Sequence, residues 1–217
     1  MTGREPLYEK YRPRAWSDVL GQEKAVERLM LMRDRGEIAG QAYWVSGQSG
    51  TGKTTVARLI AAEIAGEWGI EELDATDLTP ARLREIESGW RLTAFGKGGR
   101  AYIVNEAHGL RKDAVRQLLV MLERQPRHVA VIFTTTNDGQ QSLFEGTEDA
   151  GPLLSRCVSV SLSRRGLAEL FAARAKEIAE AEGLDGKPVA AYLRLVQQNR
   201  NNMRGVLQAI QSGEMKW

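Results

Sequence analysis

The sequence predicts an α/β fold, in which a parallel β-sheet is sandwiched by helices, followed by a small all-helical domain. Short apolar runs bounded by turn residues alternate with segments of helical period, which is typical of a parallel sheet covered by helices. After residue 163 no strand pattern follows, and three helical stretches fill the remaining sequence. We therefore expect an α/β domain over residues 1–163 and a small helical domain over residues 164–217.

The expected strands are short apolar segments. Ala42–Val45, Tyr102–Val104 and Val129–Phe133 are continuous apolar runs, as in strands that are buried on both faces. Residues 158–162 alternate apolar side chains with serines, which indicates a half-exposed strand. A weaker strand is expected near Ile70–Leu73.

Apolar residues at helical spacing predict helices between the strands and after the last one, each with its apolar side toward a core. These residues are Val56, Leu59, Ile60 and Ile64; Val115, Leu118, Leu119 and Leu122; Leu167, Leu170, Phe171 and Ile178; Val189, Tyr192, Leu193 and Val196; and Met203, Val206, Leu207 and Ile210.

The composition limits the classes of function. A net charge of +2 gives no strong overall field to attract nucleic acid, so any basic surface must be local. The one cysteine, Cys157, cannot form an internal disulfide, and the two histidines lack zinc-ligand spacing, so a cytoplasmic location is expected. No apolar run is long enough for a membrane span or a secretion signal, so we expect no membrane association.

A glycine-rich segment, Gly47–Thr54, fits the pattern GxxxxGK[ST] between a predicted strand and a predicted helix. Its glycines let backbone N–H groups wrap around phosphates, and the helix N-terminus adds positive charge. Lys53 is expected to reach the β- and γ-phosphates, and the Thr54 hydroxyl to ligate Mg²⁺. A chance match has odds on the order of 1%, so ATP with Mg²⁺ is the predicted ligand rather than an ordinary glycine-rich turn.

The residues expected to contact the nucleotide in this loop are Gly47, Gln48, Ser49, Gly50, Thr51, Gly52, Lys53, Thr54 and Thr55.

Two segments precede this loop, Leu7–Arg14 and Ser17–Glu23. Together with the loop they resemble the ATPase subunits of sliding-clamp loaders, a branch of the AAA+ family, and the resemblance continues along nearly the whole chain. In that family the opening segment wraps the adenine ring; an arm that merely packs on the core is the alternative. The resemblance implies an adenine pocket lined by Tyr11, Arg12, Pro13, Val19 and Leu20.

The segment Tyr102–His108 resembles the DEAH-like form of the Walker B motif, with one departure. Family members usually have Asp where Asn105 stands, to hold Mg²⁺ through water, and the next residue, here Glu106, activates the attacking water. An uncharged Asn105 weakens Mg²⁺ binding and slows turnover without preventing nucleotide binding. The alternatives are a naturally weak subunit, an engineered trap, or a strand end with ordinary turn hydrogen bonds.

Three further residues match the family pattern. Asn137, which is expected to end the strand VIFTTTN, resembles sensor one, which reads the γ-phosphate and orients water. Arg156, in a Ser-Arg-Cys motif, resembles the arginine that enters the nucleotide site of a neighbouring subunit, which implies a homo- or hetero-oligomer. Arg204 resembles sensor two, an arginine that contacts the γ-phosphate from the family's helical lid domain, which the resemblance places at residues 164–217. The alternatives are that Asn137 is an ordinary turn residue and that Arg156 and Arg204 are solvated surface arginines.

A basic set suggests DNA as a partner, because clamp loaders hold duplex phosphates with helix openings. The set consists of Lys97, Arg100, Arg111, Lys112 and Arg116. Ordinary surface charge explains these residues equally well.

The chain also departs from the family pattern. It ends just after the lid, so we expect no collar domain, and it lacks the four-cysteine zinc insertion of the bacterial τ/γ-type subunits. Residues 138–152 are long and acidic, and we expect a loop that meets a partner or is disordered.

The resemblance implies an ATPase that hydrolyses ATP between the subunits of an oligomer and acts with DNA and a sliding clamp. Asn105 favours a different class, a nucleotide-dependent scaffold with little hydrolysis. Another AAA+ DNA-processing ATPase, such as a branch-migration motor or an initiator-like loader, is a further alternative.

Overall fold

The computed structural model describes residues 5–91, 98–146 and 148–216. These residues form two compact units. The first contains Lys24–Gly47 and Lys53–Leu162, and the second contains the described residues up to Glu23, the loop residues Gln48–Gly52, and the chain from Ser163 onward. No helix in the described ranges is long and apolar enough to cross a bilayer.

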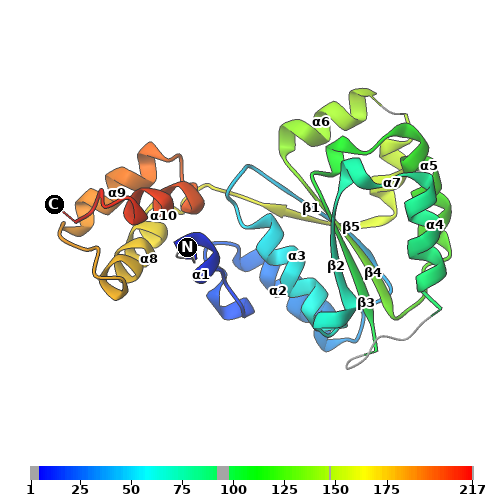
Figure 1. The fold of residues 1–217 in the computed structure, drawn as a ribbon, viewed down its shortest axis with the longest axis horizontal. Helices are drawn as coiled ribbons and strands as arrows, with labels where there is room; N and C mark the ends of the chain where they lie inside the picture. The colour runs from blue at the N-terminus through cyan, green and yellow to red at the C-terminus, as the bar shows by residue number, and fades with distance from the viewer. Residues whose placement is uncertain (1–4, 92–97, 147, 217) are drawn as a thin grey trace. The chain divides into compact units, whose positions relative to one another are not determined.

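The first unit is built on a parallel sheet with the strand order β2-β3-β4-β1-β5 (Figure 1). The five strands are β1 (Ala42–Gly47), β2 (Ile70–Asp74), β3 (Arg100–Asn105), β4 (Val129–Thr135) and β5 (Cys157–Leu162). All five strands predicted from the sequence are therefore confirmed. Ala42 pairs in register with both Val131 on β4 and Cys157 on β5, so β1 is a central strand and every one of its residues is buried.

Helices cover both faces of this sheet, as the sequence predicted. On one face lie α3 (Lys53–Ile64) and, beside it, α2 (Glu23–Asp34), joined to α3 by an ion pair between Arg33 Nη1 and Glu63 Oε1 at 3.8 Å. On the other face lie α4 (Pro80–Gly89), α5 (Lys112–Glu123), α6 (Asn137–Gly146) and α7 (Ala150–Ser155). Short 3₁₀ turns at Glu67–Gly69, Ala75–Asp77 and Ala107–Gly109 connect these elements.

The core on the second face depends on alternation along the strands. Trp44 and Phe133 point to this face, where their rings pack at a centroid distance of 5.5 Å. Leu118 of α5 and Leu153 of α7 are almost fully buried in the same cluster. This packing ties helices α4 to α7 to the sheet and thereby fixes the ends of β3 and β4.

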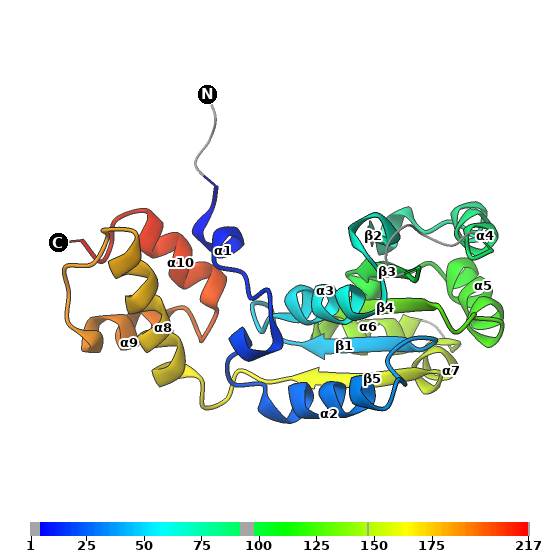
Figure 2. The same ribbon diagram turned by 90° about the horizontal axis from the view of Figure 1, so that it is seen from below.

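The second unit is helical. It contains α8 (Ala168–Ala181), α9 (Val189–Gln198) and α10 (Met203–Gln211), the three helices predicted after residue 163, with α1 (Leu7–Lys10) and a 3₁₀ turn at Trp16–Asp18. Figures 1 and 2 show α1 beside α10. Leu7 is buried among these helices, and its N–H donates to Oε1 of Gln211 at 3.0 Å. The amino-terminal arm, which we expected to belong to the α/β domain, thus packs with the lid helices.

The expectation of a long loop over residues 138–152 was wrong, because most of this segment lies in α6 and α7. Leu143 and Ala150 of this segment are buried in the core, as is Leu153, which follows it in α7. At the start of α6 the Oγ1 of Thr136 accepts a hydrogen bond from the N–H of Gly139 at 3.0 Å, as an N-cap does. Burial and capping therefore outweigh the polar composition.

Candidate functional site

The glycine-rich loop joins the end of β1 to the start of α3, as predicted. Gly50 and Gly52 have φ values of 78° and 92°, a left-handed conformation that glycine adopts without steric cost. Lys53 is buried, and its Nζ donates a hydrogen bond to the backbone oxygen of Gly47 at 3.1 Å. The lysine is therefore held against the residue at which the strand ends.

The middle of the loop is ordered by its own hydrogen bonds. The N–H and the Oγ1 of Thr51 both donate to the backbone oxygen of Gln48, at 3.3 and 2.8 Å, whereas Gln48 and Ser49 are exposed. A Cβ added at Gly50 would lie 2.1 Å from Oδ1 of Asn202, which precedes α10 in the same compact unit. A side chain at Gly50 would therefore require Asn202 to move.

Thr54 and Thr55 stand in the first turn of α3, where the sequence placed them. The backbone N–H groups of a first helical turn have no partner within the helix and carry partial positive charge, which suits a phosphate. Mg²⁺ takes oxygen ligands and usually few protein groups, the rest being phosphates and water. The half-buried hydroxyl residue Thr54 at this point of the fold fits such an ion.

Asn105, Glu106 and Asn137 lie at the edge of the sheet where the loop begins, because the carboxyl ends of parallel strands share one edge. Asn105 is the last residue of β3, and Glu106 follows it. Asn137 was expected to end β4, but β4 ends at Thr135 and Asn137 opens α6. The shift leaves Asn137 at the same edge.

Glu106 has an unusual backbone conformation. Its φ of 52° and ψ of 48° are left-handed, which costs a residue with a Cβ roughly 1–2 kcal/mol. Its side chain is 53% exposed, and its Oε2 lies 3.4 Å from Nδ1 of His108. Strain of this kind is concentrated at functional sites, and here it turns the carboxylate out of the sheet toward solvent.

Asn105 is hydrogen-bonded through both groups of its amide. Its Nδ2 donates to Oε1 of Glu72 at 2.7 Å, and its Oδ1 accepts from Oγ1 of Thr134 at 2.9 Å. Neither Glu72 nor Thr134 was a predicted site residue. Their only signal in the sequence is a place on a predicted strand, Glu72 in the weak one near residues 70–73 and Thr134 just after the run 129–133.

Asn137 faces a surface pocket of about 540 Å³. The pocket lies between the carboxyl ends of β1 and β5 and the polar side of α6, and it is lined by Ser46, Ser161, Asn137, Gln140, Gln141 and Glu145. Trp44 donates from Nε1 to Oε1 of Gln140 at 3.1 Å, which anchors α6 to β1. Asn137, the predicted sensor one, thus borders a pocket beside the carboxyl end of β1, the strand that leads into the glycine-rich loop.

Arg156 lies at the opposite edge of the sheet. It directly precedes β5, which runs parallel to β1 with Cys157 beside Ala42. Its Nη2 donates to Oε1 of Glu123 at 2.6 Å, and its Nη1 donates to the backbone oxygen of Pro152 at 3.0 Å. The full length of β5 therefore separates Arg156 from the edge that holds the glycine-rich loop in the same chain.

The residues predicted to line an adenine pocket belong to the helical unit, where all five are half-buried. The five are Tyr11, Arg12, Pro13, Val19 and Leu20. The Tyr11 hydroxyl donates to Oε1 of Glu182 at 2.7 Å, and this hydrogen bond, together with burial, raises the pKa of Tyr11. Arg12 is held by Glu9, with 3.0 Å between Nε and Oε2. Tyr11 and Leu20 pack against the core of the lid helices.

Arg204, the predicted sensor two, is exposed in the first turn of α10. Its Cζ lies 5.4 Å from the centroid of the Tyr8 ring, a cation–π distance. Asn202 caps this helix by accepting a hydrogen bond from the N–H of Gly205 at 3.4 Å. The α10 N-terminus thus carries Arg204 within the unit that also contains the middle of the glycine-rich loop.

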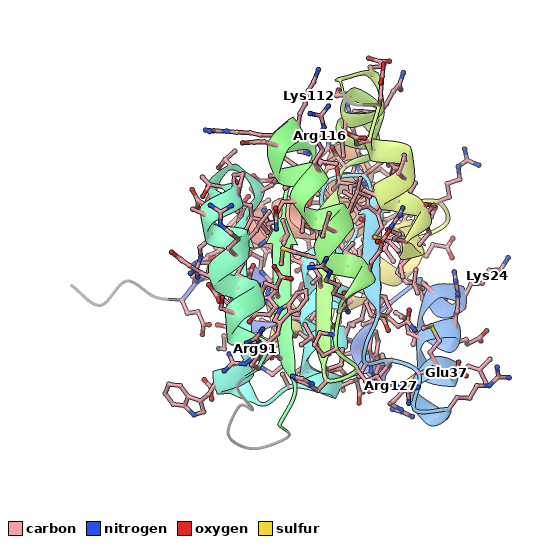
Figure 3. All side chains as sticks on the ribbon, turned by 90° about the vertical axis from the view of Figure 1, so that its right-hand side faces the viewer. Lys24, Glu37, Arg91, Lys112, Arg116 and Arg127 are labelled. Atoms are coloured by element: carbon pink, nitrogen blue, oxygen red, sulfur yellow. The ribbon has the colours of Figure 1, made fainter. Side chains whose placement is uncertain are left out.

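The predicted basic set does not form one surface. Arg111 and Lys112 stand at the start of α5, near the carboxyl ends of the strands, whereas Arg100 begins β3 at the other edge. Figure 3 shows Lys112 and Arg116 at one end of this unit, and Arg116 pairs with Asp149 at 3.0 Å. Lys97 lies outside the described residues. Only the opening of α5 remains as a local basic feature of this set.

A parallel sheet whose first strand runs through a glycine-rich loop into a helix, with acidic and amide residues at the same edge, defines a P-loop nucleotide-binding fold. Comparison with known proteins points to one family within this class. Residues 43–145 match the model of the ATPase family associated with various cellular activities, AAA.

Two relatives match nearly the whole chain. The replication factor C small subunit of Methanosphaera stadtmanae is 29% identical over 213 residues, which cover 95% of this chain and 62% of the relative. DNA polymerase III subunit tau of Escherichia coli is 27% identical, over 96% of this chain and 35% of the relative. The chain therefore spans between about one third and two thirds of the length of these relatives.

Solved structures agree on the fold. The Holliday junction branch migration motor RuvB of Thermotoga maritima superposes with a TM-score of 0.68 at 23% identity, over 93% of this chain and 64% of that one. At this identity the likeness concerns the fold alone. The resemblance to clamp-loader ATPase subunits that the sequence predicted is therefore confirmed, with the AAA model matching residues 43–145 and the relatives matching nearly the whole chain.

Proposed function

We propose that this chain binds ATP with Mg²⁺ at the loop 47–54 and hydrolyses it at an interface between subunits of an oligomer that acts on DNA. The observation that carries the proposal is the arrangement of the carboxyl edge. The buried Lys53 closes on Gly47, and Asn105, Glu106 and Asn137 end or follow the neighbouring strands at the same edge.

Each residue has a role that follows from its chemistry. Lys53 and the loop N–H groups would hold the phosphates. Thr54, and Asn105 through water, would hold the Mg²⁺, which would neutralise negative charge on the phosphates. The Glu106 carboxylate accepts a proton from the attacking water, and the Asn137 amide orients that water. Arg204 contacts the γ-phosphate from the lid, and the half-buried arm residues near Tyr11 hold the adenine.

Arg156 completes the site of a neighbouring subunit. Its position supports this role, because Arg156 precedes the amino end of β5, whereas the glycine-rich loop of the same chain follows the carboxyl end of the parallel strand β1. Transfer of a phosphoryl group then depends on oligomerisation, as with other arginine fingers supplied in trans. A sliding clamp and DNA are the proposed partners, with the opening of α5 as the contact to DNA phosphates.

The test is nucleotide affinity measured by calorimetry for the chain and for Lys53→Ala, with Lys24→Ala on α2 as a surface control. Hydrogen bonds to charged groups contribute ~1.5–3 kcal/mol, so Lys53→Ala is expected to weaken binding on the order of 10- to 100-fold. The control should bind as the parent does. A parent chain that binds no ATP, or a Lys53→Ala variant of equal affinity, would overturn the proposal.

A second candidate is a nucleotide-dependent scaffold, and Asn105 is the observation that favours it. Such a protein would bind ATP with the affinity that the loop provides but release phosphate no faster than the solution without protein. Phosphate release by the oligomer, measured with and without primed DNA, separates the two functions.

A further inference from the structure

Three neighbouring strands place polar side chains side by side on the face of the sheet that α3 covers. Glu72 on β2 pairs in register with Ile103, two residues before Asn105 on β3. Thr134 lies on β4, on the other side of β3. The Asn105 amide stands between them, bonded to Glu72 at 2.7 Å and to Thr134 at 2.9 Å.

Glu72 determines which way the Asn105 amide points. An ionised carboxylate can only accept hydrogen bonds, so it selects the orientation in which Nδ2 of Asn105 faces Glu72 and Oδ1 faces away. Among the described residues Thr134 donates to Oδ1 and occupies one of its two lone pairs, and the second lone pair can accept from another donor or bind a cation. A donor–acceptor chain of this kind polarises the amide and makes its oxygen more negative.

Glu72 is itself anchored to the helix that follows the glycine-rich loop. Its Oε2 accepts a hydrogen bond from Nε of Arg58 at 2.9 Å. Arg58 stands four residues after Thr54 on α3, and residues four apart share one face of a helix. The carboxylate thus links the residue at the end of β3 to the face of α3 that carries the proposed Mg²⁺ ligand.

We propose that Glu72 is a positioning residue, which holds the amide oxygen of Asn105 toward the Mg²⁺ end of the nucleotide site. The inference rests on the proposed function, because it assigns a partner to that same site. The Glu72–Asn105 pair would take the place of the single aspartate that the resemblance implies at position 105. Because Arg58 offsets the charge of Glu72, the contribution is orientation and polarisation of the amide rather than a full negative charge at the metal.

This pairing makes the effect of Asn105→Asp depend on Glu72. The aspartate alone would place two carboxylates at hydrogen-bonding distance, and like charges this close repel each other. With Glu72→Gln in the same chain, the glutamine amide can donate to the new carboxylate, so the hydrogen bond is kept with donor and acceptor exchanged. The two substitutions should therefore compensate each other.

The experiment compares the parent, Glu72→Gln, Asn105→Asp and the double variant, with Glu71→Gln as a matched control. Glu71 is the neighbouring carboxylate on β2, where it pairs with Arg82 rather than with Asn105. Two quantities are measured: the melting temperature without nucleotide, and the Mg²⁺ concentration that gives half of the maximal affinity for a fluorescent ATP analogue.

Asn105→Asp is expected to lower the melting temperature by ~2–4 °C, and the double variant to recover it. Glu72→Gln is expected to raise the required Mg²⁺ concentration on the order of 10-fold, as the loss of an outer-shell partner does, and Glu71→Gln to leave it unchanged.

Additive effects of the two substitutions on melting, or a Mg²⁺ requirement unchanged in Glu72→Gln, would overturn the inference while leaving the proposed function intact. A parent chain that binds no nucleotide would refute both. The melting measurements need no nucleotide, so they report on the pair independently of the proposed activity.

Discussion

Replacing Arg156 with alanine is expected to abolish ATP turnover while leaving the nucleotide affinity of the same chain nearly unchanged. β5 has six residues between Arg156 and the edge that holds the loop. At ~3.3 Å per residue these span roughly 20 Å, too far for the arginine to reach its own site. An arginine supplied by a neighbour contributes on the order of 10³–10⁵ to the rate, so the loss should be of that size.

The present contacts of Arg156 do not prevent it from acting in a neighbour's site. Its ion pair with Glu123 joins side chains that are 36% and 59% exposed. Exposed pairs contribute ~0.2–1 kcal/mol, so releasing the guanidinium costs less than about a factor of ten in occupancy. This cost is small beside the gain expected from the finger.

The assay is phosphate release from mixtures of two inactive variants. Lys53→Ala subunits offer Arg156 but bind nucleotide poorly, and Arg156→Ala subunits bind nucleotide but offer no finger. Turnover should reappear only in the mixture, where one intact site can form between unlike subunits. Glu123→Ala is the matched control and should retain turnover. Full activity in Arg156→Ala alone, or a mixture as inactive as its components, would refute the reasoning.

Three further predictions test other parts of the chain. Gly50→Ala should weaken nucleotide binding, because a Cβ at this φ of 78° also meets the Asn202 side chain. Gly36 has a similar φ of 70° but open space around it, so Gly36→Ala should lower stability alone. Calorimetry measures the nucleotide affinity of both variants, and thermal melting measures their stability. The pKa of Asp185 is lowered by a hydrogen bond from Lys176. The stability that the ionised carboxylate adds is therefore complete above about pH 4 and is lost as the pH falls through the lower folded-state pKa. Between about pH 7 and pH 3 the melting temperature of the parent should fall more steeply than that of Asp185→Asn. Lys112→Ala should reduce the slope of log affinity for duplex DNA against log salt by ~0.9, if one phosphate contact is lost.

The strands and the glycine-rich loop could be predicted from the sequence because their signals are local. Continuous apolar runs mark β1, β3 and β4, and the loop pattern depends on neighbouring positions along one segment. The helices α6 and α7 could not be predicted in this way. They contain few apolar residues, and they are held by burial of Leu143 and Leu153 against strands far away in the sequence.

The candidate site divides along the same line. Residue types that follow a strand could be assigned from the sequence to the carboxyl edge, and Asn105, Glu106 and Asn137 lie there. The amino-terminal arm was expected with the α/β domain, yet its apolar residues Leu7 and Tyr11 pack with the lid helices. A short arm has no periodicity that reveals its partner, so its packing depends on tertiary contacts alone.

Glu72 shows why part of the site lies beyond sequence analysis. The pattern that predicts a strand near residues 70–73 does not predict which strand lies beside it. Only the strand order β2-β3-β4 brings Glu72 next to Asn105. The register then decides the face: a slip by one residue would turn Glu72 away and bring Glu71 to the amide. The departure from the usual aspartate at position 105 reads in the sequence as a lost charge, whereas in the folded chain a neighbouring strand supplies a carboxylate 2.7 Å away. The proposed role of Asn105 is therefore a property of the pair, and a variant at either residue alone measures the broken pair rather than the residue.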